Sequence, residues 1–183
     1  MRSLRFLLLP LLLLVALACS KNKDKDDPAP SKTALLTGVT WRENGSSLAI
    51  NGVEGTQTVS AADADSYKFS SDGKLVVTPP SGPATNGTWA LSSDESQLTL
   101  TLDGQMITQQ IFTLNATSLS TGVSFTQAQV QAALKGQAVP GVPAGLIALI
   151  LLSAGNYTFP ANTPTIYDYQ ITSLQLRANW VPK

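Results

Sequence analysis

Residues 88–102, TWALSSDESQLTLTL, decide the fold class of this 183-residue chain. Leu98, Leu100 and Leu102 alternate with polar residues, so the three leucines lie on one face of an extended strand. Residues 88–91 form a second strand pattern, and the Ser- and Asp-rich residues between the two patterns are typical of a turn. The stretch therefore predicts an antiparallel hairpin with one buried face.

The same alternation of short strands and turns continues on both sides of this hairpin. Asp72-Gly73 and Asp103-Gly104 are the turn pairs that hairpins favour, because these residues accept positive φ. The strands expected beside the hairpin cover residues 48–53, 67–69, 74–78, 105–114, a segment from Leu119 onward, 166–171 and 174–180. We therefore expect an all-β, antiparallel meander of about eight strands. Such a meander closes into a barrel that is filled by side chains or holds one small ligand.

A late insert, residues 124–165, departs from the strand pattern. Thr126 is placed as a helix N-cap with Gln129 at the third helical position, and Phe125 and Val130 can form a hydrophobic staple. This predicts a short helix over residues 127–135, ended by Gly136. Residues 144–152 are the most apolar stretch outside the N-terminus but are too short to cross a membrane. They are either a buried helix or strand that plugs one end of the barrel, or a lid or docking patch.

The N-terminus has the pattern of a secretory signal peptide. Arg2 and Arg5 precede the apolar residues 6–18, which are fewer than the roughly 20 needed for a transmembrane helix. An uncleaved N-terminal anchor is the alternative. We expect a signal peptide over residues 1–18, and the sole cysteine, Cys19, follows it directly.

Residues 16–19, Ala-Leu-Ala-Cys, resemble the lipobox of bacterial lipoproteins. The resemblance implies that Cys19 is acylated and anchors the chain in the outer membrane, with the membrane face undetermined. Residues 19–32 then form a disordered tether. It is either a plain spacer or an export signal, because residues 23–27, KDKDD, are similar to the acidic signal of surface lipoproteins of Bacteroidota. One folded domain remains, over residues 33–183.

Several motifs of this domain resemble the lipocalin-like domain of Bacteroidota lipoproteins over residues 34–123. The motifs are Leu35-Leu36-Thr37-Gly38 with Trp41, Tyr67-Lys68-Phe69 with Asp72-Gly73, Gly87-Thr88-Trp89, and Leu98-Thr99-Leu100. The resemblance implies a lipocalin-like barrel whose first strand starts at Gly38. It also implies that the indole of Trp41 is packed by Arg177 from the last strand, as a structural pair at the barrel end. In the alternative, Arg177 points into solvent.

The composition argues against catalysis and nucleic-acid binding. The chain has no histidine and one cysteine, which removes the commonest general base and the Cys/His zinc sites. Its formal net charge is zero, without the basic surface that nucleic acid needs. The acidic pairs Asp63/Asp65 and Asp94/Glu95 lie in polar, turn-like stretches where carboxylates stay solvated. We expect no catalytic residues, metal or cofactor, and we place Trp41, Trp89 and Trp180 in the core.

Two functions fit these expectations. In the first, a lipid-anchored envelope lipoprotein captures a small apolar or amphipathic ligand in the mouth of its barrel. In the second, the barrel is filled, and an accessory lipoprotein binds an envelope protein through the insert 124–165. The sequence does not identify ligand-binding residues. Whether Leu98, Leu100 and Leu102 fill the barrel interior discriminates between the two.

Overall fold

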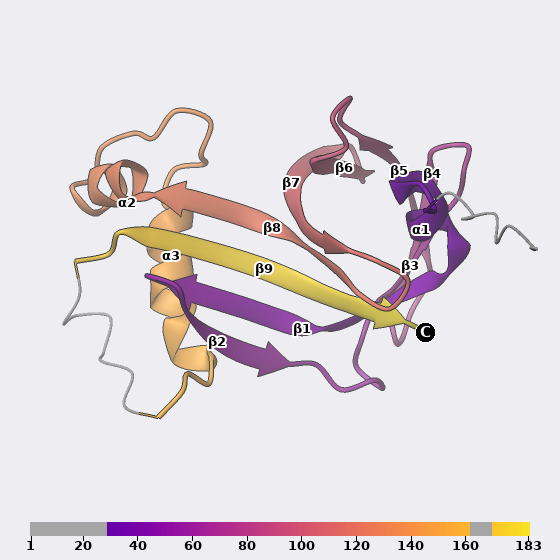
Figure 1. Cartoon of the computed structure of the whole chain (residues 1–183), viewed down its shortest axis with the longest axis horizontal. Coiled ribbons are helices and arrows are strands. Elements are labelled where there is room, and N and C mark those ends of the chain that lie inside the picture. Colours follow the sequence, from indigo (N-terminus) through magenta and orange to yellow (C-terminus); the bar gives the residue numbers. More distant parts are fainter. Residues whose placement is uncertain (1–28, 162–169) are drawn as a thin grey trace, which may run out of the picture.

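The computed structural model describes residues 29–161 and 170–183. Within these two ranges, nine strands, three short helices and a 3₁₀ turn follow one another (Figure 1). The helices are α1 (Lys32–Gly38), α2 (Gln127–Leu134) and α3 (Leu146–Leu152), and the 3₁₀ turn covers Ser153–Asn156. The strands are β1 (Thr40–Ile50), β2 (Val53–Thr58), β3 (Ser66–Phe69), β4 (Lys74–Thr78), β5 (Thr85–Leu91), β6 (Gln97–Leu102), β7 (Gln105–Leu114), β8 (Leu119–Thr126) and β9 (Ser173–Pro182).

The strands form one antiparallel sheet that closes on itself. The order is β2-β1-β3-β4-β5-β6-β7-β8-β9, and β9 also pairs with β1. This closure makes an eight-stranded barrel in which β2 is an additional strand. The predicted all-β meander is therefore confirmed, and the barrel is consistent with the lipocalin-like class.

Sequence patterns account for several of these strands directly. Lys74–Thr78 and Gln105–Leu114 form β4 and β7 with the predicted bounds. Asp103 and Gly104 have φ values of 48° and 75°, so both residues adopt the left-handed conformation of a tight hairpin turn. The strand predicted over residues 166–171 lies largely outside the described residues, and β9 begins at Ser173.

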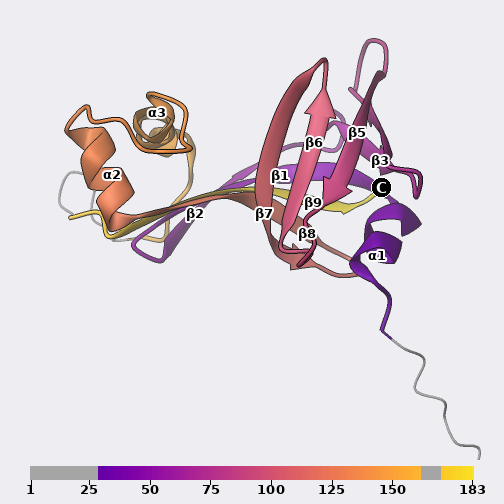
Figure 2. The same cartoon turned by 90° about the horizontal axis from the view of Figure 1, so that it is seen from above.

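The first strand is longer than predicted and changes its partner along its length. Residues 40–42 of β1 pair with β3, whereas residues 45–50 pair with β2. The register against β9 shifts between Glu43 and Gly45, where the strand bulges. Because β1, β8 and β9 continue past the barrel, they form with β2 a second, open part of the sheet (Figures 1 and 2).

Apolar side chains fill the barrel. Leu98 is 1% exposed and Leu100 is 7% exposed, and Leu102 packs partly buried against them. The buried members of this cluster are Leu36, Trp41, Phe69, Leu75, Val77, Trp89, Leu98, Leu100, Leu119 and Trp180. All three tryptophans are thus core residues, as predicted.

A helix closes one end of the barrel where the sequence predicted the start of a strand. Ser31 caps α1, its hydroxyl accepting a hydrogen bond of 3.1 Å from the amide of Ala34. Gly38 ends this helix, and β1 starts only at Thr40. Leu36 is fully buried in the barrel core, so α1 supplies the plug.

The predicted helix in the insert is confirmed. The Thr126 hydroxyl accepts from the amide of Gln129, and the Gln129 side chain accepts from the amide of Thr126, which completes a capping box. Beyond the helix, the amides of Gly136 and Gln137 donate to the carbonyls of Ala133 and Ala132. This Schellman motif ends α2 at the predicted glycine.

The apolar stretch 144–152 does not plug the barrel. It forms α3, whose buried side chains Ile147, Ile150 and Leu151 belong to a second hydrophobic cluster on the open part of the sheet. Residues 127–161, which we call the helical lobe, lie at the opposite end of the molecule from α1 (Figure 2). On β9, Leu174 and Leu176 face this cluster while Ala178 and Trp180 face the barrel core. None of the helices in the described parts has the length and apolar character of a transmembrane helix.

Candidate functional site

The loop between α2 and α3 has a shape that its sequence specifies. In Val139-Pro140-Gly141-Val142, the amide of Val142 donates to the carbonyl of Val139 at 3.1 Å. The amide of Leu146 makes the same bond, also 3.1 Å, to the carbonyl of Pro143. Gly141 and Gly145 occupy the third positions of these two turns with φ of 73° and 78°, as type II turns require. Two consecutive tight turns therefore define the path of the loop into α3.

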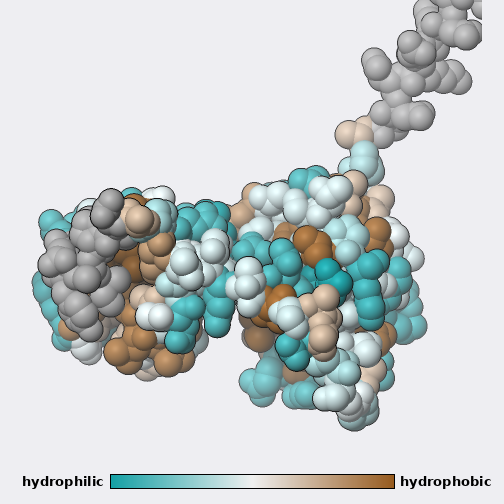
Figure 3. Space-filling model, turned by 90° about the horizontal axis from the view of Figure 1, so that it is seen from below, coloured by the Kyte–Doolittle hydropathy of each residue, from teal (hydrophilic) through white to brown (hydrophobic). Residues whose placement is uncertain are grey.

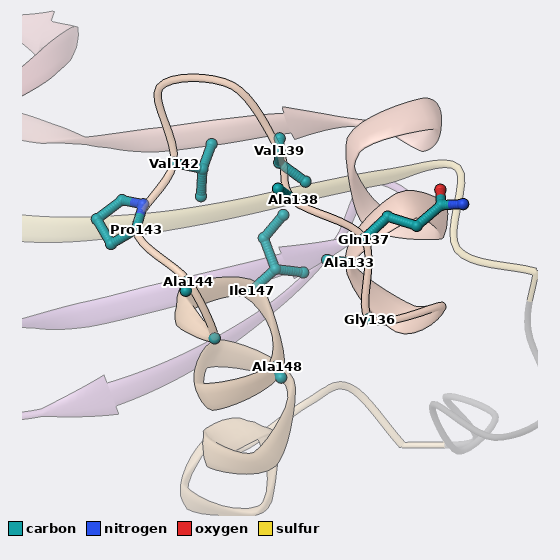
Figure 4. A pocket seen from close by; sticks show the side chains of 11 residues that line it. Ala133, Gly136, Gln137, Ala138, Val139, Val142, Pro143, Ala144, Ile147 and Ala148 are labelled. Atoms are coloured by element: carbon teal, nitrogen blue, oxygen red, sulfur yellow. The ribbon is translucent and has the colours of Figure 1, made fainter.

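A pocket of about 320 Å³ lies between this loop and the two helices (Figure 4). Ile147 forms its floor and is 1% exposed, and Val139 and Val142 pack partly buried beside it. The remaining lining residues are small or uncharged: Ala133, Gly136, Gln137, Ala138, Pro143, Ala144, Gly145 and Ala148. The amide of Gln137 extends away from Val142 and Ile147 (Figure 4), so the interior is apolar. A concave apolar site of this volume is in the range of small-molecule pockets.

The chain segment that forms the pocket is almost free of charge. Between Asp103 and Asp168 the sequence contains a single charged residue, Lys135. Lys135 is the C-cap of α2 and directly precedes the lining residues Gly136 and Gln137. Its side chain is exposed and makes no ion pair with any carboxylate of the described residues.

Exposed apolar side chains lie on the same lobe. Leu149 is 64% exposed and Leu152 is 79% exposed on the outer face of α3, and Leu134 at the end of α2 is 54% exposed. Figure 3 shows hydrophobic surface gathered on this lobe beside the barrel. The lobe therefore offers apolar contacts to another molecule, as do Met106 and Ile107, which are 72% and 51% exposed on β7 of the barrel.

The predicted contact between Trp41 and Arg177 is wrong. In the pairing of β1 with β9, Trp41 lies opposite Pro182, whereas Arg177 lies opposite Ser47. Side chains alternate along a strand, and Ala178 packs against the barrel core, so its neighbour Arg177 points to the other face. The indole Nε1 of Trp41 instead donates to the carbonyl of Leu36.

Arg177 has other partners on the outer face of the sheet. Its guanidinium lies over the ring of Phe112, 4.7 Å from the centroid, and its Nη2 donates to Gln175. Its Nη1 is 3.6 Å from a carboxylate oxygen of Glu54, and its side chain is 28% exposed. The alternative, an Arg177 that points into solvent from an edge strand, is also wrong, because β9 pairs with both β1 and β8 and the side chain makes these contacts.

The acidic pairs behave as turn residues. Asp94 accepts hydrogen bonds from the hydroxyls of Ser92 and Ser96, at 2.5 and 2.7 Å, and these lower its pKa to about 2. A carboxylate with that pKa is a poor general acid at neutral pH. Asp63 accepts a 2.6 Å bond from Ser60. In residues 29–161 and 170–183, no three Asp, Glu, His or Cys side chains converge as a metal site.

A third acidic pair, Glu43 with Asp65, escaped the sequence analysis. The amide of Glu43 donates to the carbonyl of Asp65 at 3.0 Å. Burial, followed by the charge of Asp65, raises the pKa of Glu43. Burial, then Asp65 and Glu43, raises the pKa of Tyr67 to about 12. Because the two carboxylates are 22 residues apart in the chain, only the pairing of β1 with β3 brings them together.

The lobe pocket was also missed, although the sequence carries a signal for it. The Pro-Gly turn at 140–141 and the lack of charge around Lys135 are both visible in the sequence. The predicted lipidation residue, Cys19, and most of the predicted tether lie outside the described residues.

The fold and the pocket together define a class: a closed antiparallel β-barrel that carries a helical lobe with an apolar pocket. No protein-family model matches the chain, and no curated protein matches its sequence.

Proposed function

We propose that this protein is a lipid-anchored, non-enzymatic binding module that holds a small apolar molecule in its helical lobe. The observation that carries the proposal is the apolar pocket of about 320 Å³ between α2 and α3. Burial of apolar ligand surface in such a site supplies roughly 25 cal/mol per Å². The ligand site is thus proposed in the lobe and not in the mouth of the barrel.

The filled barrel supports a ligand site in the lobe, because the barrel interior is occupied by side chains. Ten buried side chains, from Leu36 at one end to Trp180, contact one another in its interior. In the present proposal the barrel is a solid scaffold. Its strands β1, β8 and β9 extend beyond it and carry the lobe (Figure 1).

The proposed anchor places the lobe away from its attachment point. The described chain begins next to α1, at the barrel end opposite the lobe (Figure 2). Acylation of Cys19 would leave ten residues, 19–28, as the connection, with a reach of at most about 36 Å. We propose the outer membrane as the location of this anchor.

Native mass spectrometry of protein purified from the membranes of its own host tests the proposal. Residues 29–183, released under mild conditions, should retain a small molecule at one-to-one stoichiometry that is lost on denaturation. Ala148→Phe places a ring at the exposed rim of the pocket and should abolish retention. Ala128→Phe, on the exposed first turn of α2 and outside the pocket lining, is the matched control.

A bare chain mass, also after incubation with a total lipid extract of the host, would contradict the ligand proposal. The exposed face of α3 around Leu149 and Leu152 would then be the site to test against envelope proteins.

A further inference from the structure

The position of Lys135 relative to the pocket carries information about the ligand. Lys135 is the only charged residue among the 64 residues 104–167, and it follows the last residue of α2. The next two residues, Gly136 and Gln137, line the pocket. A lysine carries its ammonium group on a flexible four-carbon stem, so the charge of Lys135 can reach the pocket rim.

The side chains that line the pocket offer little polar contact to a ligand. The pocket walls are alanine, glycine, valine, proline and isoleucine, and the one polar side chain, Gln137, extends outward (Figure 4). A buried polar group on the ligand would lose its hydrogen bonds to water without replacement. The mostly apolar lining therefore favours a hydrocarbon group in the enclosed part of the ligand.

We propose that the pocket binds a single-chain anionic amphiphile, with the hydrocarbon tail in the pocket and a carboxylate beside Lys135. The inference rests on the proposed function and names the ligand class for the same site. The pocket of about 320 Å³ is in the range of small-molecule sites, so a single hydrocarbon chain of medium length can occupy it. A medium-chain fatty carboxylate satisfies both requirements.

Two features of the lobe favour an unbranched chain. Six of the lining residues are alanine or glycine, so the walls are made largely of methyl groups and backbone: Ala133, Gly136, Ala138, Ala144, Gly145 and Ala148. The two tight turns at 139–142 and 143–146 hold one wall, so the loop has little freedom to widen for a bulky ring.

Isothermal titration calorimetry with three C10 probes tests the inference on the chain from residue 19 onward, kept unacylated by Cys19→Ser. The probes are decanoate, decan-1-ol and decyltrimethylammonium, at pH 7.5 and low salt. Decanoate should bind about two- to fivefold more tightly than decan-1-ol, the range for an exposed ion pair. Its advantage should shrink as salt screens the charge. The cationic probe should bind most weakly.

Substitutions of Lys135 separate the contribution of the ion pair to probe affinity from the contribution of tail burial. Lys135→Gln should remove the advantage of decanoate and leave decan-1-ol binding unchanged, whereas Lys135→Arg should retain the advantage. Lys183→Gln, at the barrel end of the chain, is the matched control and should change neither affinity. Ala148→Phe should abolish binding of both probes.

Equal affinities for decanoate and decan-1-ol, unchanged by Lys135→Gln, would overturn the inference and leave the apolar pocket of the proposed function intact. Binding that survives Ala148→Phe would overturn it as well, because the tail would then lie elsewhere. No binding of any probe would overturn this inference, whereas the proposed function would be overturned only if the native mass spectrum also showed a bare chain. If decanoate binds only when it is carried in phosphatidylglycerol vesicles, the protein recognises a bilayer surface. That result would overturn the inference that the pocket binds a free fatty carboxylate.

Discussion

The indole Nε1 of Trp41 donates a 3.0 Å hydrogen bond to the backbone carbonyl of Leu36, and both side chains are fully buried. This bond joins the first strand of the barrel to the helix that closes its end. The Trp41 indole therefore has a backbone partner in α1, in place of the predicted contact with the Arg177 guanidinium. The end of the barrel is closed by α1 from within the domain, while Arg177 is used on the outer face of the sheet.

Leu36→Ala tests the role of α1 as the plug. Removing a fully buried leucine should lower the free energy of unfolding by about 2–5 kcal/mol, because a cavity replaces its packing contacts. Leu152→Ala, at a side chain that is 79% exposed, should change it by less than about 0.5 kcal/mol. Urea unfolding followed by tryptophan fluorescence measures both. Similar effects for the two variants would show that α1 does not belong to the core.

A double-mutant cycle distinguishes the observed partner of Arg177 from the predicted one. Arg177→Met combined with Phe112→Leu should show a coupling of about 0.5–1 kcal/mol, the size of a partly exposed cation–π contact. The same cycle with Trp41→Phe in place of Phe112→Leu should show a coupling near zero, since the side chains lie on different faces of the sheet. A larger coupling with Trp41 would favour the lipocalin-like pairing.

Strands whose burial alternates locally were predictable from sequence. In β6, Leu98 and Leu100 alternate with Thr99, and a turn pair follows the strand. The buried face and the end of this strand can therefore both be predicted from the sequence. The capping box at Thr126 was equally visible, because it depends on residues three apart.

Features that depend on distant residues were not predictable in this way. In β1, Gly45-Ser46-Ser47 interrupt the apolar alternation, yet Ser47 is 1% exposed because β2 and β9 flank it. The local pattern therefore predicted only the end of this strand, and the resemblance placed its start at Gly38, before the observed start at Thr40. The pocket depends on where two tight turns place Val142 relative to Ile147, which no local pattern specifies. The partner of Arg177 was missed because it depends on the register between β1 and β9.

Glu43→Gln should stabilise the fold at neutral pH. Burial and the nearby charge of Asp65 raise the pKa of Glu43, so the ionised form is disfavoured in the folded state relative to the unfolded state. Its ionisation therefore costs stability above the folded pKa, and the cost disappears below the ordinary value of 4.5. The advantage of the variant should be present at pH 7 and vanish near pH 4, as measured by thermal unfolding. Asp103→Asn, at an exposed hairpin turn, is the control. An advantage that grows on acidification would contradict the assigned cause.

Asp94→Ala should show the opposite pH dependence. Hydrogen bonds from Ser92 and Ser96 lower the pKa of Asp94 to about 2, so its contribution to stability is present above the ordinary value of 3.8. That contribution is lost as the pH falls from 3.8 to about 2. The variant should be less stable than the wild type at pH 7, and the difference should narrow at pH 2.5. Urea midpoints at the two pH values provide the measurement, and a constant difference would refute the lowered pKa.

Gly136→Ala tests whether the end of α2 shapes the pocket. Gly136 has φ of 71° in the Schellman motif, a conformation in which a Cβ costs roughly 1–2 kcal/mol. The variant should lose about that much stability and should also bind the C10 probes more weakly, because relief of the strain moves Gln137 and Ala138 at the pocket wall. Gly155→Ala, in the 3₁₀ turn where an added Cβ meets nothing within 4 Å, should leave both properties unchanged. If Gly136→Ala is destabilised but binds the probes with unaltered affinity, the shape of the pocket depends on the two loop turns and not on the end of α2.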